Sequence, residues 1–156
     1  MVSSGESAPG PEPVRAGAGV VGVGTDLVDI DRFRRVLART PRVAERVFTD
    51  GERAYAGSAR DPVPRLAARF AAKEAALKAL GVGLGGARFA EIEVERRAGG
   101  EPALLVRGAA ARRARERGVD RFLVTLSHTD HLAQATVIAV AGGDGAPPTP
   151  DGDRAP

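Results

Sequence analysis

The sequence lacks cysteine and tryptophan, and aromatic residues make up only 4% of its 156 residues. Without cysteine there are neither disulfides nor thiolate metal sites. So few aromatic rings are unfavourable for a protein that stacks the bases of single-stranded nucleic acid. No apolar run approaches the length of about 20 residues that a membrane-spanning helix needs. We therefore expect a globular protein with neither a membrane nor a nucleic acid as its partner.

The two ends of the chain are also poor in large apolar side chains. Residues 1–18 and 142–156 consist mainly of Gly, Pro, Ala, Ser and acidic residues. Such segments cannot bury enough surface to offset the entropy lost on ordering, so both are predicted to be disordered tails. Residues 19–141 are predicted to form one domain. Since the first residues lack the apolar stretch of a secretory signal, a cytoplasmic protein is expected.

Lysine is scarce as well. Of the 23 basic residues only two are lysines, and both lie within residues 69–80. Arginine presents a planar fork of donors, whereas lysine is a compact charge that can reach a phosphate. The net charge of +3 and the pI of about 10.1 would suit an anionic partner, although an arginine-rich composition alone gives the same values.

Alternating and capping patterns predict the order of the elements. They indicate a strand over 20–27, a helix over 30–37, a helical turn around 43–47, a short helix opened by Thr49 and Glu52, a long helix over 63–80, strands over 89–96 and 102–107, a helix over 109–117, and a hairpin of strands over 122–126 and 132–140. Strands that follow strands, with helices between them, predict an α+β fold: a mainly antiparallel sheet with the long helix packed on it.

The long helix combines an apolar stripe with a group of charges. Lys73 falls inside the stripe, and Glu74 lies at its edge, four residues before Lys78. One interpretation is a lysine whose stem is buried and a surface ion pair. The stripe itself consists of Leu66, Phe70, Leu77 and Leu80.

A functional interpretation arises when the first strand is considered together with this helix. Asp26 shares a strand face with Gly22 and Gly24, where missing side chains leave room for something to approach. Asp26 and Glu74 would together offer two carboxylates to Mg²⁺, which completes its shell with water and phosphate oxygens. The cations of the long helix would then form a metal-assisted phosphate site with them: Arg69, Lys73 and Lys78.

Two further groups of residues have both structural and functional interpretations. His128 and His131 flank the last predicted turn, without a third metal ligand nearby. They are either turn residues, or Ser127 and His128 contact a phosphate. The early helix and the turn after it carry arginines that form either a solvated face or a docking surface for an acidic protein: Arg32, Arg34, Arg35, Arg39, Arg42 and Arg46.

Three segments resemble the holo-[acyl-carrier-protein] synthases of the 4′-phosphopantetheinyl transferase superfamily. Residues 21–28, followed by Arg32 and Phe33, are similar to the opening of these proteins. Residues 69–75 are close to their central signature, and residues 126–128 resemble their closing motif. The segments occur in the order and at the spacing of the family, and the resemblance spans the whole predicted domain.

The resemblance implies an activity and a role for each matching residue. It implies transfer of 4′-phosphopantetheine from coenzyme A to a serine of an apo acyl carrier protein, which releases adenosine 3′,5′-bisphosphate. Asp26 and Glu74 match the magnesium ligands, and Lys78 matches a lysine near the transferred phosphate. Arg69, Lys73 and His128 match positions that bind coenzyme A phosphates, Ser127 lies in the closing motif beside His128 and is expected to bind coenzyme A with it, and Arg32, Arg39 and Arg42 match the surface that meets the carrier. Small members of the family form homotrimers with active sites between subunits.

This chemistry agrees with the residues themselves. Phosphoryl transfer depends mainly on positioning and on charge neutralisation, which magnesium and a few cations supply. Glu74, acting directly or through a water, is the candidate general base. Two alternatives remain: a basic nucleic-acid-binding module, and a protein that binds coenzyme A without catalysis. Leu132 stands where the family often has an aromatic residue.

Overall fold

The computed structural model describes residues 19–83 and 85–142. Apart from residue 84 the expected domain lies within this part, and the two predicted tails lie outside it except for Gly142. The elements in chain order are β1 (Val20–Asp29), α1 (Ile30–Arg39), α2 (Arg42–Val47), α3 (Asp50–Gly57), α4 (Val63–Ala79), the 3₁₀ turn η1 (Phe89–Glu91), β2 (Ile92–Arg96), β3 (Pro102–Val106), α5 (Gly108–Glu116), β4 (Val119–His128) and β5 (Leu132–Ala141).

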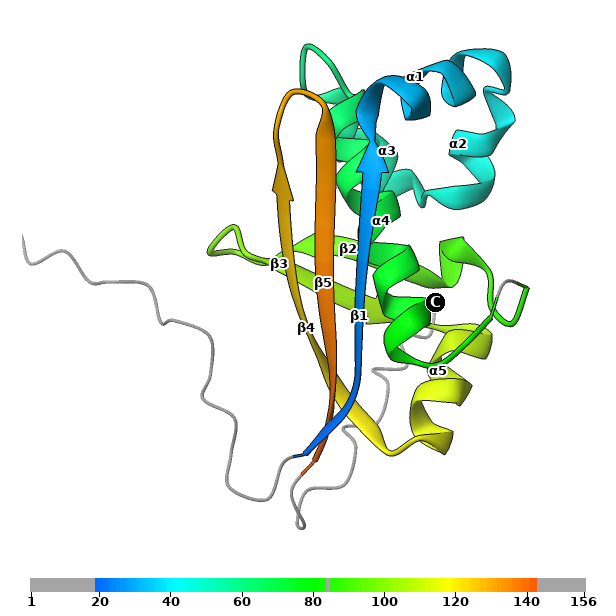
Figure 1. The fold of residues 1–156 in the computed structure, drawn as a ribbon, viewed down its shortest axis with the longest axis vertical. Coiled ribbons are helices and arrows are strands. Elements are labelled where there is room, and N and C mark those ends of the chain that lie inside the picture. The colour runs from blue at the N-terminus through cyan, green and yellow to red at the C-terminus, as the bar shows by residue number, and fades with distance from the viewer. Residues whose placement is uncertain (1–18, 84, 143–156) are drawn as a thin grey trace, which may run out of the picture.

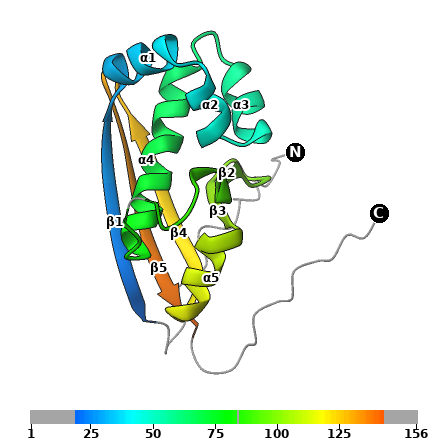
Figure 2. The ribbon, with the colours of Figure 1, turned by 90° about the vertical axis from the view of Figure 1, so that its right-hand side faces the viewer.

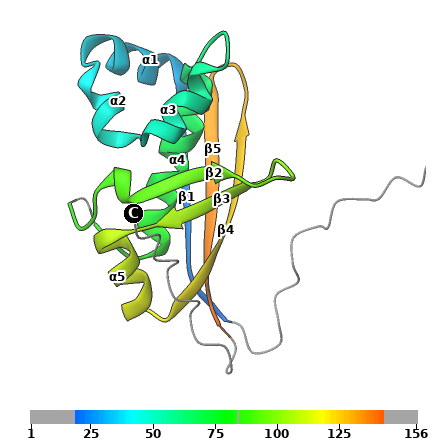
Figure 3. The same cartoon turned by 180° about the vertical axis from the view of Figure 1, so that it is seen from behind.

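The strands form two antiparallel sheets. β1, β5 and β4 lie side by side in that order, and β2 pairs with β3 in a separate hairpin (Figure 1). The helix α4 covers one face of the three-stranded sheet, and no element of the described residues covers the other face (Figure 2). The helices α2 and α3 lie on the side of α4 away from the sheet, whereas the β2–β3 hairpin and α5 lie beside α4, where β3 and α5 contact β4 (Figure 3). The predicted α+β fold is confirmed.

The helix α4 approaches β1 unusually closely because two glycines face it. A β-carbon added to Gly24 would lie 1.8 Å from the carbonyl oxygen of Ala75, and one added to Gly22 would lie 2.0 Å from that of Ala79. These distances are far below van der Waals contact, so only glycine fits at either position. The room left by the glycines is therefore filled by the backbone of α4, which brings its side chains close to those of β1.

The ends of the first helices follow the capping signals of the sequence. The Asp29 carboxylate accepts a hydrogen bond of 2.7 Å from the backbone N–H of Arg32, as an N-cap does. Thr49 and Glu52 form the predicted capping box at the start of α3. The long helix ends at Ala79, one residue before the predicted end, and the C-cap Leu80 is followed by Gly81, whose φ of 61° suits glycine.

The apolar stripe of α4 forms the centre of the core. Leu66, Leu77 and Leu80 are buried and Phe70 is partly buried, as the sequence predicts. The remaining inward positions of α4 are mostly alanines, which lie against β1 and β5. No helix of the described residues is long and apolar enough to cross a membrane.

Two strands, β2 and β4, differ most from their predicted bounds. The strand expected over 89–96 begins only at Ile92, because Phe89–Glu91 form a 3₁₀ turn. The Glu91 carboxylate accepts hydrogen bonds from the backbone N–H groups of Ala109 and Ala110 at the start of α5, so this residue does not alternate with its neighbours as in a strand. The strand β4 extends beyond 122–126 at both ends because it pairs with β5 along almost its whole length.

Candidate active site

Asp26 on β1 and Lys78 in the last turn of α4 form an ion pair. The Lys78 Nζ lies 2.8 Å from the Asp26 Oδ1 and donates a second hydrogen bond of 2.9 Å to the Thr25 carbonyl. The Asp26 side chain is 18% exposed and that of Lys78 is 51% exposed. The pair is therefore open to solvent on one side, where a ligand has access to it.

Glu74 lies one helical turn before Lys78 and completes a cluster with this pair, which we call the Asp26–Glu74–Lys78 cluster. Burial raises the pKa of Glu74, the negative charge of Asp26 raises it further, and the positive charge of Lys78 opposes both effects. The two carboxylates are thus close enough to repel each other. The alternative interpretation, a surface ion pair between Glu74 and Lys78, is wrong, because Lys78 forms its ion pair with Asp26.

The cluster fits a hard divalent cation. Repulsion between two carboxylates is relieved when a cation binds them, and oxygen ligands are those that magnesium prefers. Within the described residues no group of three or more His, Cys, Asp or Glu side chains could hold a metal ion. Among residues 19–83 and 85–142, Asp26 and Glu74 would therefore be the carboxylate ligands of such an ion, and water and substrate oxygens would supply the others.

Replacing Glu74 by Gln is expected to raise the stability of the metal-free protein at neutral pH. Because folding raises the pKa of Glu74, the native state binds this proton more tightly than the unfolded chain does. Stability therefore falls as pH rises from the ordinary value of 4.5 through the raised pKa, and an amide escapes this loss. Urea unfolding in EDTA should show Glu74→Gln as the more stable protein at pH 7, with the difference vanishing below pH 4. An equal difference at both pH values would contradict this explanation.

Lys73 has a different position from the one predicted. Its side chain is fully buried, and its Nζ donates to the Phe89 carbonyl at 2.9 Å and to the Ile92 carbonyl while pairing with the Glu52 carboxylate at 2.8 Å. An ammonium group has three protons, so these three partners use all of its donors. Lys73 therefore lies in the core with its donors in use, a position that does not favour the predicted contact with a coenzyme A phosphate.

Arg69 lies on the side of α4 that faces α3. It is 4% exposed, its guanidinium carbon is 4.1 Å from the centre of the Tyr55 ring, and its Nε is buried without a hydrogen-bond partner. Burial lowers its pKa. Arg65 and Arg96 also lie over the Tyr55 ring, at 4.6 Å and 5.5 Å. This group of arginines is separate from the Asp26–Glu74–Lys78 cluster of the same chain.

Ser127 and His128 end β4, two strands away from β1. Through β5, Ser127 is level with Leu27, and His128 is level with Val28. Residues level with each other share a face of an antiparallel sheet, and successive residues alternate. Ser127 therefore lies on the opposite face from Asp26, whereas His128 lies on the same face. Within one chain the Ser127 side chain does not meet the cluster.

The arginines expected to dock a partner are solvent-exposed. Arg32 and Arg39 lie on α1, Arg42 begins α2, and none of the three has an ion pair within the described residues. Arg34 differs, because both of its terminal nitrogens donate to the Asp61 carboxylate, at 3.0 and 2.7 Å. Of the two histidines at the β4–β5 turn, His131 lies 3.4 Å from the Asp31 carboxylate.

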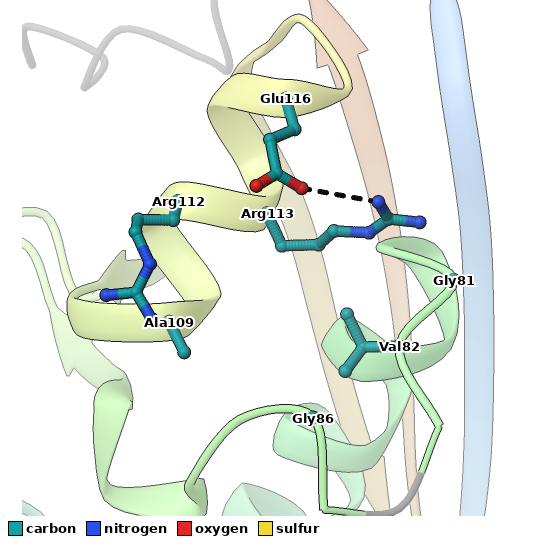
Figure 4. A pocket seen from close by; sticks show the side chains of 7 residues that line it. All are labelled: Gly81, Val82, Gly86, Ala109, Arg112, Arg113 and Glu116. Atoms are coloured by element: carbon teal, nitrogen blue, oxygen red, sulfur yellow. Dashed lines mark hydrogen bonds and ion pairs between the residues drawn. The ribbon is translucent and has the colours of Figure 1, made fainter.

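A pocket that the sequence analysis did not predict lies beside the end of α4. It has a volume of about 280 Å³ and lies between α5 and the loop that follows α4 (Figure 4). The Arg113 side chain reaches toward Gly81 and contacts Glu116 at 3.3 Å. In the sequence, residues 109–117 had only the pattern of an Ala/Arg helix, which does not indicate what the helix faces. The lining residues are Gly81, Val82, Gly86, Ala109, Arg112, Arg113 and Glu116.

Comparison with known proteins identifies relatives across the whole domain. Residues 22–137 match the model of the 4′-phosphopantetheinyl transferase superfamily. The holo-[acyl-carrier-protein] synthase of Syntrophotalea carbinolica is 48% identical over 119 residues, which cover 75% of this chain and 93% of that protein. That of Moorella thermoacetica is 44% identical over 115 residues, which cover 74% of this chain and 90% of that protein.

Solved structures give the same result. The holo-[acyl-carrier-protein] synthase of Neisseria meningitidis superimposes with a TM-score of 0.71 at 33% identity, over 78% of this chain and 98% of that one. The coenzyme A complex of the Chronobacterium ammoniagenes protein superimposes with a TM-score of 0.67 at 33% identity, over 75% of this chain and 94% of that one. The chain therefore belongs to the holo-[acyl-carrier-protein] synthase family of the 4′-phosphopantetheinyl transferase superfamily, a family of enzymes.

Proposed function

We propose that the protein transfers 4′-phosphopantetheine from coenzyme A to a serine of an apo acyl carrier protein in the cytoplasm. The reaction requires magnesium and releases adenosine 3′,5′-bisphosphate. The observation that carries this proposal is the convergence of Asp26, Glu74 and Lys78 from β1 and α4 at a solvent-open position. The relatives named above are synthases that modify acyl carrier protein, and one of them has coenzyme A bound.

The chemistry requires neutralisation of charge on a pyrophosphate. The serine oxygen of the carrier forms a bond to the phosphorus next to pantetheine, and the bond from that phosphorus to the bridging oxygen breaks. The leaving group departs with the electron pair as adenosine 3′,5′-bisphosphate. Lys78 supplies a positive charge beside this centre, and Asp26 and Glu74 would hold the magnesium ion. When bound, magnesium neutralises the developing charge and orients the phosphates.

Glu74 is also the group best suited to accept the proton of the attacking serine. Burial and Asp26 raise its pKa in the metal-free protein, whereas a bound magnesium ion would lower it, so the base role rests on the position of this carboxylate rather than on its pKa. The proton passes to the Glu74 carboxylate directly or through a water. Lys78 is a poorer base, because its ammonium is paired with Asp26 and bonded to the Thr25 carbonyl.

The predicted coenzyme A residues support an oligomer with shared sites. Within one chain, Arg69 and the Ser127 side chain lie apart from the Asp26–Glu74–Lys78 cluster, so a site that uses all of them needs a second copy. We propose the homotrimer expected from the family, assembled through the uncovered face of the three-stranded sheet. Val23 and Leu27 on that face are 60% and 61% exposed, and Leu132 is 42% exposed. Sedimentation of the pure protein tests this assembly.

The pocket beside α4 is the proposed extension of the same site. Its lining residues include Arg112, Arg113 and Glu116, of which the last two form an ion pair, and it lies directly after the helical turn that carries Lys78. Positive charge at that position would suit an anionic group of coenzyme A. The arginines over the Tyr55 ring, which are Arg65, Arg69 and Arg96, would bind coenzyme A at the site of a neighbouring subunit.

The direct test is to mix the protein with coenzyme A, magnesium and an apo carrier protein and then weigh the carrier. A gain equal to one phosphopantetheine on the carrier serine, absent when EDTA is added, is expected. An unchanged carrier mass across fatty acid and polyketide carriers would overturn the proposal. Salt-sensitive binding to arbitrary DNA without turnover of coenzyme A would favour the nucleic-acid-binding alternative instead.

Reversing two charges on the docking helices is expected to weaken the carrier interaction specifically. The double change Arg32→Glu and Arg42→Glu should raise the KM for the acidic carrier at least about tenfold, because like charges would then face each other. The KM for coenzyme A should stay within about twofold, since neither arginine lies in the Asp26–Glu74–Lys78 cluster. Steady-state kinetics with each substrate varied in turn provide the measurement. Arg97→Glu, an exposed position in the β2–β3 turn, is the matched control.

A further inference from the structure

The core contains an ion pair from which solvent is entirely excluded. The Lys73 Nζ lies 2.8 Å from the Glu52 Oε2, and both side chains are 0% exposed. Glu52 also accepts hydrogen bonds from the backbone N–H groups of Thr49, at 3.0 Å, and Val94, at 2.9 Å. With the bonds from Lys73 to the Phe89 and Ile92 carbonyls, this pair joins α4 to α3, η1 and β2.

Such a pair adds little to stability compared with apolar residues of the same size. The cost of removing two charges from water roughly cancels their attraction, so an apolar pair often stabilises a core as well or better. Unlike apolar contacts, the hydrogen bonds of a charged pair are directional, because each of them fixes an angle as well as a distance. What Glu52 and Lys73 supply that an apolar pair would not is therefore a defined orientation of α4.

On the β1 side, the only long side chain of α4 that makes directed contacts with the described residues is Lys78, which is 51% exposed, and the buried packing there involves small groups. There Ala75 and Ala79 lie against Gly24 and Gly22, so the contact is between small groups and backbone. Small side chains fix the distance between the two elements but offer few knobs to prevent rotation. Lys73 is the one long side chain of α4 that is anchored at its tip by three directed contacts in the core.

The position of Lys73 in the sequence links this anchor to the candidate active site. Consecutive helix residues are about 100° apart around the axis, so Lys73 faces η1 and β2 while Glu74 faces β1. A rotation that moves Glu74 away from Asp26 must also pull Lys73 away from its three partners. Lys78, five residues after Lys73, turns with the same helix.

We propose that Glu52 and Lys73 are positioning residues for the reaction, which set the rotation of α4 so that Glu74 and Lys78 meet Asp26. This inference rests on the proposed function, because it concerns the geometry of the same two carboxylates. Neither residue contacts the substrates. Their effect reaches the site through the backbone of α4 alone.

The test compares single and double replacements by two independent measurements. Lys73→Met leaves the Glu52 carboxylate buried without its cation, and the double change Glu52→Gln with Lys73→Met removes both charges and keeps an amide that can accept from Val94. For each protein, urea unfolding gives the stability, and calorimetric titration with Mn²⁺ in the presence of coenzyme A gives the affinity for the ion. Val47→Ala, a buried change on α2, is the control for destabilisation alone.

A positioning role predicts that the two measurements separate. The double variant should regain most of the stability that Lys73→Met loses, yet bind Mn²⁺ at least about tenfold more weakly than the wild type, with a correspondingly lower rate of transfer. Val47→Ala should lose stability and keep the wild-type affinity. If the double variant binds Mn²⁺ as tightly as the wild type, the inference is overturned and the proposed function stands. If the wild-type protein itself binds no ion, the proposed metal site fails and the inference fails with it.

Discussion

Glu74→Gln is expected to lower the rate of phosphopantetheine transfer at least about 100-fold, since both charge neutralisation and proton acceptance depend on this carboxylate. The amide is almost the same size, so the fold and the packing of α4 should be unchanged. The same replacement should stabilise the metal-free protein at neutral pH, because the raised pKa of Glu74 makes its charge unfavourable there. A large loss of activity together with a gain in stability is characteristic of a residue kept for function.

The measurement is the initial rate of carrier modification followed by mass spectrometry. Glu95→Gln is the matched control, because Glu95 is an exposed glutamate of β2 and makes no ion pair within residues 19–83 and 85–142. It should keep the wild-type rate. A Glu74→Gln protein that modifies the carrier at the wild-type rate would remove Glu74 from the mechanism. Complete loss of transfer with intact coenzyme A binding would also exclude the idea that the protein merely binds coenzyme A.

The second large effect is a loss of stability, which is expected when one methyl group is added at Gly24. Gly24→Ala should destabilise the protein by about 3 kcal/mol or more, at the upper end of what overpacking costs in a core. The added β-carbon would lie 1.8 Å from the Ala75 carbonyl oxygen, and backbone atoms cannot yield as a flexible side chain does. β1 and α4 would have to separate, which would also pull Asp26 away from Glu74 and Lys78. Transfer activity should fall together with stability.

The midpoint of urea unfolding measures this effect directly. Gly57→Ala is the matched control, since a β-carbon at Gly57 would meet nothing within 4 Å at the end of α3. This change should leave stability unaltered or slightly higher, because alanine restricts the unfolded chain. A Gly24→Ala protein as stable as the wild type would show that α4 is not held against β1 in the way described.

Local patterns predicted the elements, because capping and alternation signals lie close together in the sequence. The convergence of Asp26 with Glu74 and Lys78 joins residues far apart in the chain, and it was predicted from the types of these residues and from the family resemblance instead. Alternation placed Asp26 with Gly22 and Gly24, and the wheel of the long helix placed Lys73 inside the apolar stripe. The structure agrees with both placements. What the wheel could not provide was the partner of Lys73, since Glu52 belongs to another helix and already had an explanation as a cap.

The other differences between prediction and structure have the same cause: local patterns do not indicate contacts between elements that are distant in the sequence. Glu91 fits a strand pattern, but its carboxylate caps α5, a contact that alternation cannot indicate. Whether Ser127 and Asp26 share a face depends on the pairing of β4 and β1 through β5, which is fixed only by the folded sheet. The pocket beside α4 requires knowing which face of α5 meets the loop after α4.

The pairing of β1 with β5 has a consequence for how the chain acquires its structure during synthesis. The strand made first lies between α4 and solvent, and its hydrogen-bonding neighbour in the sheet is the strand made last, with Val20 opposite Val140. At ribosomal speeds of about 5–20 residues per second, β1 waits several seconds with an unpaired edge. β4 also pairs with β5, so the synthesis of this last strand provides a hydrogen-bonding partner for one edge of β1 and one edge of β4. A chain stopped before β5 would leave these two edges free to pair with other unfinished chains.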